Sequence, residues 1–160
     1  MNNVEPLAKP TRTRRKTNYK GADLKKTSGL TPRTDKQKEF IDALSSSNQV
    51  FVLGPAGTGK TYVTATVASD LYTTKQIDKI VITRPHVAVG KELGFLKGDL
   101  NEKTMPWALP VLDVLEKHLG KGTVETGIKN GNIEMAPLAL MRGRSFDNAF
   151  IIVDETQNIT

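Results

Sequence analysis

A glycine-rich octapeptide constrains the fold of this chain more than any other feature. Residues 54–61 read Gly-Pro-Ala-Gly-Thr-Gly-Lys-Thr and match the phosphate-loop (Walker A) pattern G-x-x-x-x-G-K-[ST]. The apolar run Val50–Leu53 before them predicts a buried strand, whereas Val63, Val67 and Leu71 after them mark one face of a helix. A strand, a glycine-rich turn and a helix in this order are the context in which such a loop binds phosphate, and an ordinary strand-to-helix turn is the alternative.

The residue types in the octapeptide each have a physical reason. Gly57 and Gly59 allow the backbone to turn its N–H groups inward without a Cβ clash, and the following helix adds the positive end of its dipole. Lys60 would reach the β- and γ-phosphates of ATP, and the Thr61 hydroxyl would ligate Mg²⁺. The predicted ATP-binding residues are Gly54, Pro55, Ala56, Gly57, Thr58, Gly59, Lys60 and Thr61.

A pair of carboxylates follows the apolar run Phe150–Val153, which predicts another strand (the Walker B position). A carboxylate at the tip of a buried strand needs a compensating partner, and a Mg²⁺ held from the other side by Thr61 would supply one. We therefore expect Asp154 to bind the metal. Glu155 and Lys60 would be catalytic, with Glu155 as the general base for the attacking water. Taken alone, such a pair is equally compatible with a surface turn.

The remaining patterns predict an α/β domain. Thr34 and Gln37 have the spacing of a capping box at the start of a helix. Further strands are expected at Lys79–Thr83 and Ile133–Ala136, and a helix at Val111–Leu119 that a glycine ends. Short apolar strands that alternate with amphipathic helices predict a parallel sheet with helices on both faces.

Composition excludes several classes of protein. The chain has no cysteine and two histidines, which excludes disulfide scaffolds and cysteine-ligated zinc and disfavours a histidine-built metal site. No apolar run is long enough to cross a membrane. We expect a cytoplasmic protein, located in the host cytoplasm if a phage encodes it.

All of the net charge of +6 lies in residues 1–26, where eight Lys or Arg stand against two acidic residues. This stretch has almost no periodic apolar side chains, so it cannot bury enough surface to offset the entropy of ordering. We expect a disordered basic arm over residues 1–30 and a globular domain over residues 31–160. The arm is either a tether for nucleic acid or a solubilising tail. Its candidate contacts to nucleic acid are Arg12, Arg14, Arg15 and Lys16.

Five further segments follow the phosphate loop in an order typical of one known family. The segments are Ile82–Pro85, Leu93–Leu100, Ala136–Ala139, Met141–Arg144 and Asp154–Asn158. With the phosphate loop, the chain resembles the PhoH family, which are phosphate-starvation-inducible-type P-loop ATPases of bacteria and phages, over about residues 30–160. The resemblance implies a RecA-like fold, similar to the N-terminal motor domain of superfamily 1 helicases, and an ATP-coupled task on single-stranded RNA or DNA. Homo-oligomers such as hexameric rings are common among relatives of this fold.

Further residues take a role from the resemblance, and each has a structural alternative. Gln37 would contact the adenine edge, although its capping-box position is an equal alternative and one side chain can hardly serve both. Arg84 would face nucleic acid or a neighbouring subunit, and Arg142 and Arg144 would contact phosphates; solvated surface arginines are the alternative. Trp107 is interpreted as core packing in preference to base stacking.

The chain departs from the family after the acidic pair. Family members continue past Thr160 with a further strand, which in RecA-like folds lies between the phosphate-loop strand and the strand that precedes Asp154. We therefore expect an incomplete sheet, and ATP hydrolysis only if that strand is present or supplied. The alternative function is a nucleotide- or nucleic-acid-binding module without turnover. A nucleotide kinase is disfavoured because no arginine-rich lid can be placed between the second and the last strand.

Overall fold

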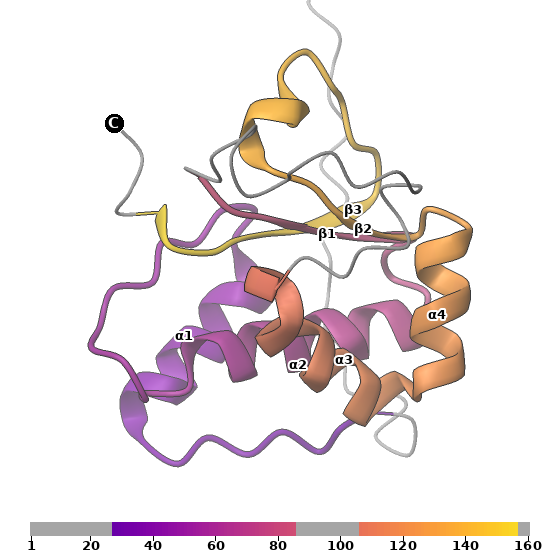
Figure 1. Ribbon diagram of the computed structural model, residues 1–160. Coiled ribbons are helices and arrows are strands. Elements are labelled where there is room, and N and C mark those ends of the chain that lie inside the picture. The colour runs from indigo at the N-terminus through magenta and orange to yellow at the C-terminus, as the bar shows by residue number, and fades with distance from the viewer. Residues whose placement is uncertain (1–26, 86–105, 157–160) are drawn as a thin grey trace, which may run out of the picture.

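The computed structural model describes residues 27–85 and 106–156 (Figure 1). Its helices are α1 (Asp35–Ser46), α2 (Lys60–Thr73), α3 (Leu109–Leu119) and α4 (Lys121–Lys129), with two 3₁₀ turns, η1 (Pro106–Ala108) and η2 (Leu138–Met141). Its strands are β1 (Lys79–Thr83), β2 (Ile133–Met135) and β3 (Ala149–Val153). The predicted contacts of the basic arm and the Leu93–Leu100 segment lie outside the described residues, as do residues 157–160. Those arm contacts are Arg12, Arg14, Arg15 and Lys16.

The three strands form a parallel sheet in the order β2-β1-β3. Ile80 in β1 lies opposite Ile133 in β2 and Phe150 in β3, so these apolar residues form one row across the sheet. Parallel strands are buried on both faces and are therefore rich in apolar residues, as the sequence KIVIT of β1 illustrates. The predicted α/β class with a parallel sheet flanked by helices is confirmed.

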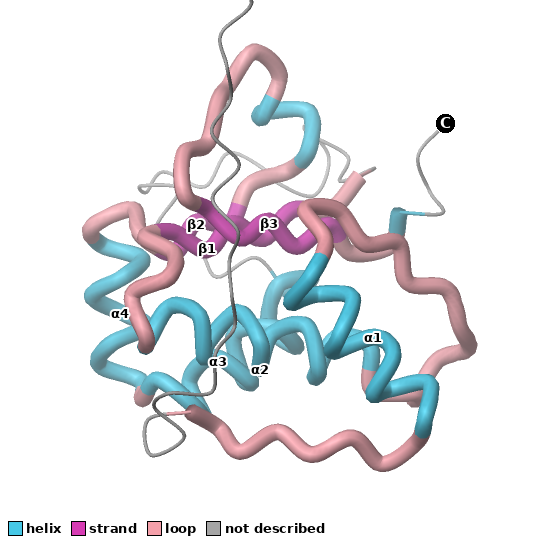
Figure 2. The backbone as a smooth tube through the Cα atoms, turned by 180° about the vertical axis from the view of Figure 1, so that it is seen from behind, coloured by secondary structure: helices cyan, strands magenta, loops and turns pink. Residues whose placement is uncertain are grey.

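The core lies between the sheet and the helices. Ile80, Ile82 and Ile133 face α2, α3 and α4 and are almost completely buried there, together with Leu115 of α3 and Val124 of α4. Figures 1 and 2 show the four helices on the same side of the sheet, and the segment that contains η2 on the other side. The expectation of helices on both faces is therefore not met within the described residues.

The prediction of a strand at Val50–Leu53 is wrong. These residues belong to no strand, and the side chains of Phe51 and Leu53 are 76% and 92% exposed. An apolar run forms a strand only where a neighbouring strand accepts its backbone hydrogen bonds. The described strands pair only with one another, in the order β2-β1-β3, and residues 50–53 pair with neither edge strand.

The other predicted elements are found close to where the sequence places them. Helix α3 ends at Gly120, which has a φ of 84° and donates its N–H to the Glu116 carbonyl at 2.9 Å. Trp107 packs against the core cluster, so its interpretation as a core residue is confirmed. Among the described residues, no helix combines the length and the apolar character that a membrane crossing requires.

Two glycines in α4 allow a matched test of how closely this helix packs on β2. A Cβ added at Gly127 would lie 2.8 Å from Cδ1 and 2.9 Å from Cγ1 of the buried Ile133, whereas a Cβ at Gly122 would meet nothing within 4 Å. We expect Gly127→Ala to lower the free energy of unfolding by about 1–2 kcal/mol through overpacking. Gly122→Ala should leave the free energy unchanged or raise it by up to about 1 kcal/mol. Urea unfolding of both variants checks this, and equal shifts for the two would contradict the close packing of α4.

Candidate nucleotide site

The glycine-rich loop leads directly into the amino-terminal end of α2. Gly57 and Gly59 have φ values of 78° and 83°, a region that favours glycine, and α2 begins at Lys60 with no side chain capping its first turn. The free N–H groups of this turn and the positive end of the helix dipole are suited to an anion. The conformation of residues 57–60 thus agrees with the physical reasons for their residue types.

The loop folds around the side chain of Lys60. The ammonium nitrogen of Lys60 lies 2.6 Å from the carbonyl oxygen of Gly54 and 2.7 Å from that of Pro55, and it donates hydrogen bonds to both. The hydroxyl of Thr58 donates to the Pro55 carbonyl at 2.9 Å and closes the same curve. The amine is therefore held across the loop, where the oxygens of a phosphate could take the place of these carbonyl acceptors.

Gln37 contacts both the capping turn of α1 and the glycine-rich loop. Its backbone N–H donates to the Thr34 hydroxyl at 3.2 Å, and its side-chain oxygen accepts from the Arg33 N–H at 2.8 Å. Its side-chain nitrogen donates to the Thr58 carbonyl at 3.3 Å. Gln37 therefore keeps its place in the capping turn while its amide nitrogen reaches the loop, because the two ends of the amide bond to different segments. A contact with adenine stays a prediction.

The acidic pair follows β3 at the end of the molecule where the glycine-rich loop also lies (Figure 1). The Asp154 N–H donates to the Thr83 carbonyl at 2.9 Å, which continues the ladder between β1 and β3, and the Asp154 side chain is half-buried. Glu155 has a φ of 54°, a conformation that is uncommon for residues other than glycine and that clusters at functional sites.

The sequence predicts that Lys60 and Asp154 converge on one magnesium-bound nucleotide. Within the described residues, no hydrogen bond or ion pair joins Asp154 to Lys60 or Thr61. The same residues contain no group of three His, Cys, Asp or Glu side chains that could hold a metal ion by itself. A magnesium ion between Thr61 and Asp154 therefore stays a prediction, and it would draw further ligands from nucleotide oxygens and water.

The donor set at the loop fits a magnesium-bound nucleotide. It offers the backbone N–H groups of a loop with positive φ at two glycines, and one ammonium, which are groups that bind phosphate oxygens. It also offers one threonine hydroxyl, an oxygen ligand of the kind that Mg²⁺ binds. The backbone of Gly59 also lies close to the side chain of Gln37, since a Cβ added at Gly59 would lie 3.4 Å from the side-chain nitrogen of Gln37. Lys60, Thr61 and Asp154 are the residues that would hold the nucleotide and its metal.

The hydroxyl of Thr83 is a polar group that the sequence analysis did not single out. Thr83 is fully buried at the carboxyl end of β1, beside Asp154, and its Oγ1 is the buried side-chain atom without a hydrogen-bond partner among the described residues. A polar residue directly after the apolar run Ile80–Ile82 is the sequence signal that could have indicated it.

Arg144 is engaged on the sheet face that the helices leave open. Its guanidinium forms a two-pronged ion pair with Glu134, with 3.0 Å between Nη2 and Oε2, and Lys79 contacts the same carboxylate at 2.7 Å. The Arg144 hydrogen bond is the main reason that the pKa of Glu134 falls to about 2. The ring of Phe146 lies 4.8 Å from the guanidinium and 5.6 Å from the Lys79 ammonium.

The three candidate arginines thus differ in how available they are. Arg144 would have to break its pair with Glu134 before it could bind a phosphate. Arg142 is exposed, and Arg84 is half-buried with its carbonyl bonded to the Leu138 N–H at 3.1 Å. A role of these residues with nucleic acid stays a prediction.

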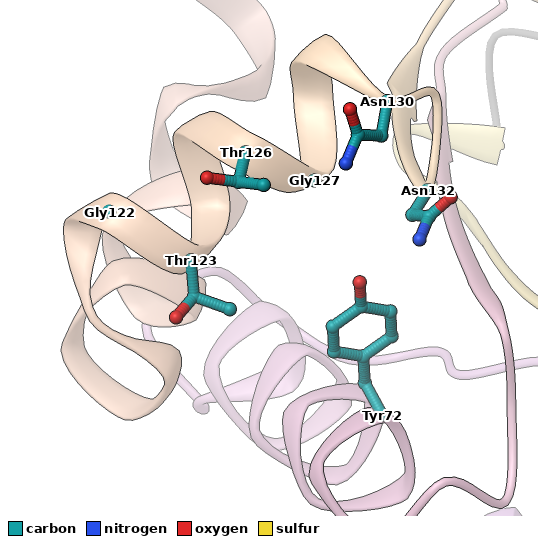
Figure 3. Close-up of a pocket in the computed structure, with 7 residues that line it drawn as sticks. All are labelled: Tyr72, Gly122, Thr123, Thr126, Gly127, Asn130 and Asn132. Atoms are coloured by element: carbon teal, nitrogen blue, oxygen red, sulfur yellow. The ribbon is translucent and has the colours of Figure 1, made fainter.

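A hollow of about 490 Å³ lies near the carboxyl-terminal end of α2, away from the loop (Figure 3). The hydroxyl of Tyr72 points into it, and the other polar groups are threonine hydroxyls and asparagine amides. Because the lining contains no charged side chain, this hollow is a poor match for a triphosphate. The lining residues are Tyr72, Gly122, Thr123, Thr126, Gly127, Asn130 and Asn132.

The parallel α/β sheet and a Walker A loop at the start of a buried helix define the class of P-loop NTPases. Within that class, the family model described as PhoH-like protein matches residues 29–160, and this chain belongs to that family. P-loop NTPases bind nucleotides, generally with Mg²⁺.

Named relatives agree with this assignment. The chain is 46% identical over 128 residues to the PhoH-like protein of Bacillus subtilis strain 168, an alignment that covers 80% of this chain and 40% of the relative. It is 44% identical over 131 residues to the PhoH-like protein of Mycobacterium bovis, covering 82% and 37%. It is 40% identical over 140 residues to Protein PhoH of Escherichia coli K12, covering 86% and 40%. The chain thus spans about two fifths of the length of these curated relatives.

Acid should weaken the attachment of Arg144 to the sheet. The pKa of Glu134 in the folded protein is about 2, which is below its ordinary value of 4.5. The ionised carboxylate therefore contributes its full stabilisation of the fold at pH values above 4.5, and this contribution is lost as the pH falls toward 2. We expect the difference in free energy of unfolding between the parent and Glu134→Gln to be constant near neutral pH and to shrink between pH 4.5 and 2.

Urea unfolding at a series of pH values measures this difference. Glu125→Gln is the control, because the Glu125 carboxylate lies 3.9 Å from Lys121 on an exposed face of α4 and should contribute little at any pH. A Glu134→Gln difference that keeps its neutral-pH size down to pH 2 would contradict the assigned role.

Proposed function

We propose that this protein binds ATP through residues 54–61 and hydrolyses it in a Mg²⁺-dependent reaction coupled to RNA or DNA. The observation that carries the proposal is the glycine-rich loop that closes around Lys60 at the uncapped start of α2. Membership in a P-loop family supports the same reading. The coupling to nucleic acid is inferred from the motifs that resemble PhoH proteins, and from the charge of residues 1–26.

Each residue has a defined task in this proposal. The Lys60 ammonium neutralises charge on the β- and γ-phosphates, and the loop N–H groups hold their oxygens. The Thr61 hydroxyl and the Asp154 carboxylate hold Mg²⁺, which offsets phosphate charge when it is bound. Glu155 orients the attacking water and accepts its proton. Gln37, already at the loop, contacts the adenine.

A second candidate function is a nucleotide- or nucleic-acid-binding module without turnover. It is favoured by one observation, which is that no hydrogen bond or ion pair joins Asp154 to Lys60 or Thr61 in the described residues. The two functions differ in turnover. ATPase activity of the 160-residue chain above background would refute the second, whereas activity only in a form extended to the length of the relatives would support a dependence on further chain.

Two substitutions separate binding from hydrolysis. Lys60→Ala should weaken ATP binding by about a hundredfold or more, because it removes a charge-assisted contact to the phosphates. Glu155→Gln should keep the affinity within about threefold and abolish hydrolysis in any form that turns over, since an amide cannot accept the proton.

Fluorescence titration with a labelled ATP and release of inorganic phosphate measure the two effects. Lys36→Ala is the matched control, because Lys36 is an exposed lysine paired with Glu39 on α1. Unchanged affinity in Lys60→Ala would refute the nucleotide site, and parental turnover in Glu155→Gln would refute the general base.

Deletion of residues 1–26 tests the proposed tether. We expect the full chain to bind a single-stranded oligonucleotide with an affinity that falls steeply with salt, and the shortened chain to lose most of that binding. Fluorescence anisotropy at several salt concentrations measures it, for RNA and DNA of the same sequence. Equal affinity of the two chains would leave solubility as the role of the arm.

The remaining parts of the proposal follow the family. We propose a cytoplasmic protein, in the host cytoplasm if a phage encodes it, with a role linked to phosphate starvation and assembly into a homo-oligomer such as a hexamer. Sedimentation with and without ATP tests the assembly state.

A further inference from the structure

A short segment of chain, residues 28–34, connects the second half of α2 to the turn of α1 that contacts the glycine-rich loop. We call these residues the strap. Figure 1 shows the strap running along the outer side of the helices, from the far end of the helical layer to the start of α1. Its first residue contacts Asp70 in the second half of α2, and the turn that follows its last residue reaches the loop that precedes α2.

The first anchor of the strap is a pair of hydrogen bonds to a buried carboxylate. The Ser28 N–H donates to Oδ1 of Asp70 at 2.7 Å, and the Ser28 hydroxyl donates to Oδ2 at 2.8 Å. Asp70 is only 4% exposed, so it depends on these donors to offset the loss of hydration. Hydrogen bonds to a charged acceptor are stronger than neutral ones, which makes this a firm attachment across 42 residues of sequence.

The second anchor is the amide of Gln37. Its oxygen accepts the N–H of Arg33 in the strap, and its nitrogen donates to the Thr58 carbonyl in the phosphate loop. A Cβ at Gly59 would lie 3.4 Å from the same nitrogen, so the amide also packs against the backbone of Gly59. The strap, Gln37, the loop and α2 therefore form a closed ring of contacts.

We propose that Ser28 and Asp70 are positioning residues for the nucleotide. Their pair holds the strap, the strap holds Gln37, and Gln37 holds the curvature of the loop at Thr58 and Gly59. This inference rests on the proposed ATP binding at residues 54–61. It predicts that the Ser28 hydroxyl, which lies outside the phosphate loop, affects nucleotide affinity through Gln37.

A double-mutant cycle on the full 160-residue chain tests the connection. Ser28→Ala should weaken binding of a labelled ATP by about three- to tenfold, because one of the two bonds to Asp70 is lost. In the Gln37→Ala background the same change should have no further effect, since the path to the loop is already broken. Ser28→Thr, which keeps the hydroxyl, should restore the parental affinity.

Control measurements separate positioning from stability. Ser46→Ala removes a hydroxyl that donates only to the Asp42 carbonyl within α1, and it should leave ATP affinity unchanged. Amide exchange of Arg33, followed by NMR without nucleotide, should become several-fold faster in Ser28→Ala, because its acceptor Gln37 is released. Equal losses of affinity in both backgrounds, or unchanged exchange at Arg33, would overturn the proposal. Failure of the parent protein to bind ATP would refute the proposed function. The exchange experiment, which needs no nucleotide, would still show whether the Ser28 hydroxyl holds the strap and Gln37 in place.

Discussion

Burial of α2 on nearly every side is the constraint on which the rest of this structure depends. Ala65 and Ala68 are fully buried and allow the helix to lie close to the sheet. The buried hydroxyls of Thr66 and Ser69 donate to carbonyls four residues earlier in the same helix, and the Thr66 hydroxyl also lies 3.2 Å from Nε2 of His118 in α3. Because the helix is enclosed, its amino-terminal end is fixed relative to the sheet, and the position of the phosphate loop follows from it.

The two faces of the sheet are stabilised in different ways. The helical face is an apolar core, whereas the opposite face carries a cluster of charges centred on Glu134. That carboxylate links its own strand to Lys79 in β1 and to Arg144 in the segment between η2 and β3. Arg144 therefore has a structural role in the fold, and its ion pair with Glu134 explains its position without a bound phosphate.

The candidate nucleotide site consists of two parts with different support. Lys60 and Gln37 both form hydrogen bonds to the glycine-rich loop, so this part of the site is assembled within the described residues. Asp154 and Glu155 follow β3 at the same end of the molecule, and among the described residues no hydrogen bond or ion pair joins Asp154 to Lys60 or Thr61. The exposed side chains of Phe51 and Leu53 lie in the chain between α1 and the loop. The assignment of Mg²⁺ to Thr61 and Asp154 is accordingly supported by the sequence motifs and not by a contact between these residues.

Local patterns in the sequence were sufficient for much of this description. The loop, its helix, and the strands β1, β2 and β3 each follow from a few neighbouring residues, because turn conformation and side-chain periodicity are local properties. Helix α4 was not predicted, since Gly122 and Gly127 lower its helical propensity and its stability comes from packing on Ile133.

The amino-acid sequence by itself determined the class, the family and the residues of the phosphate loop, which depend on residue types at short spacings. Only the tertiary structure decided which partners distant in the chain these residues have. It pairs Arg144 with Glu134, brings Gln37 to Thr58, binds Ser28 to Asp70 and leaves Val50–Leu53 outside the sheet. The physical reason is that hydrogen bonds, ion pairs and strand pairing need a partner at a defined place in space, and no pattern along one segment contains that place.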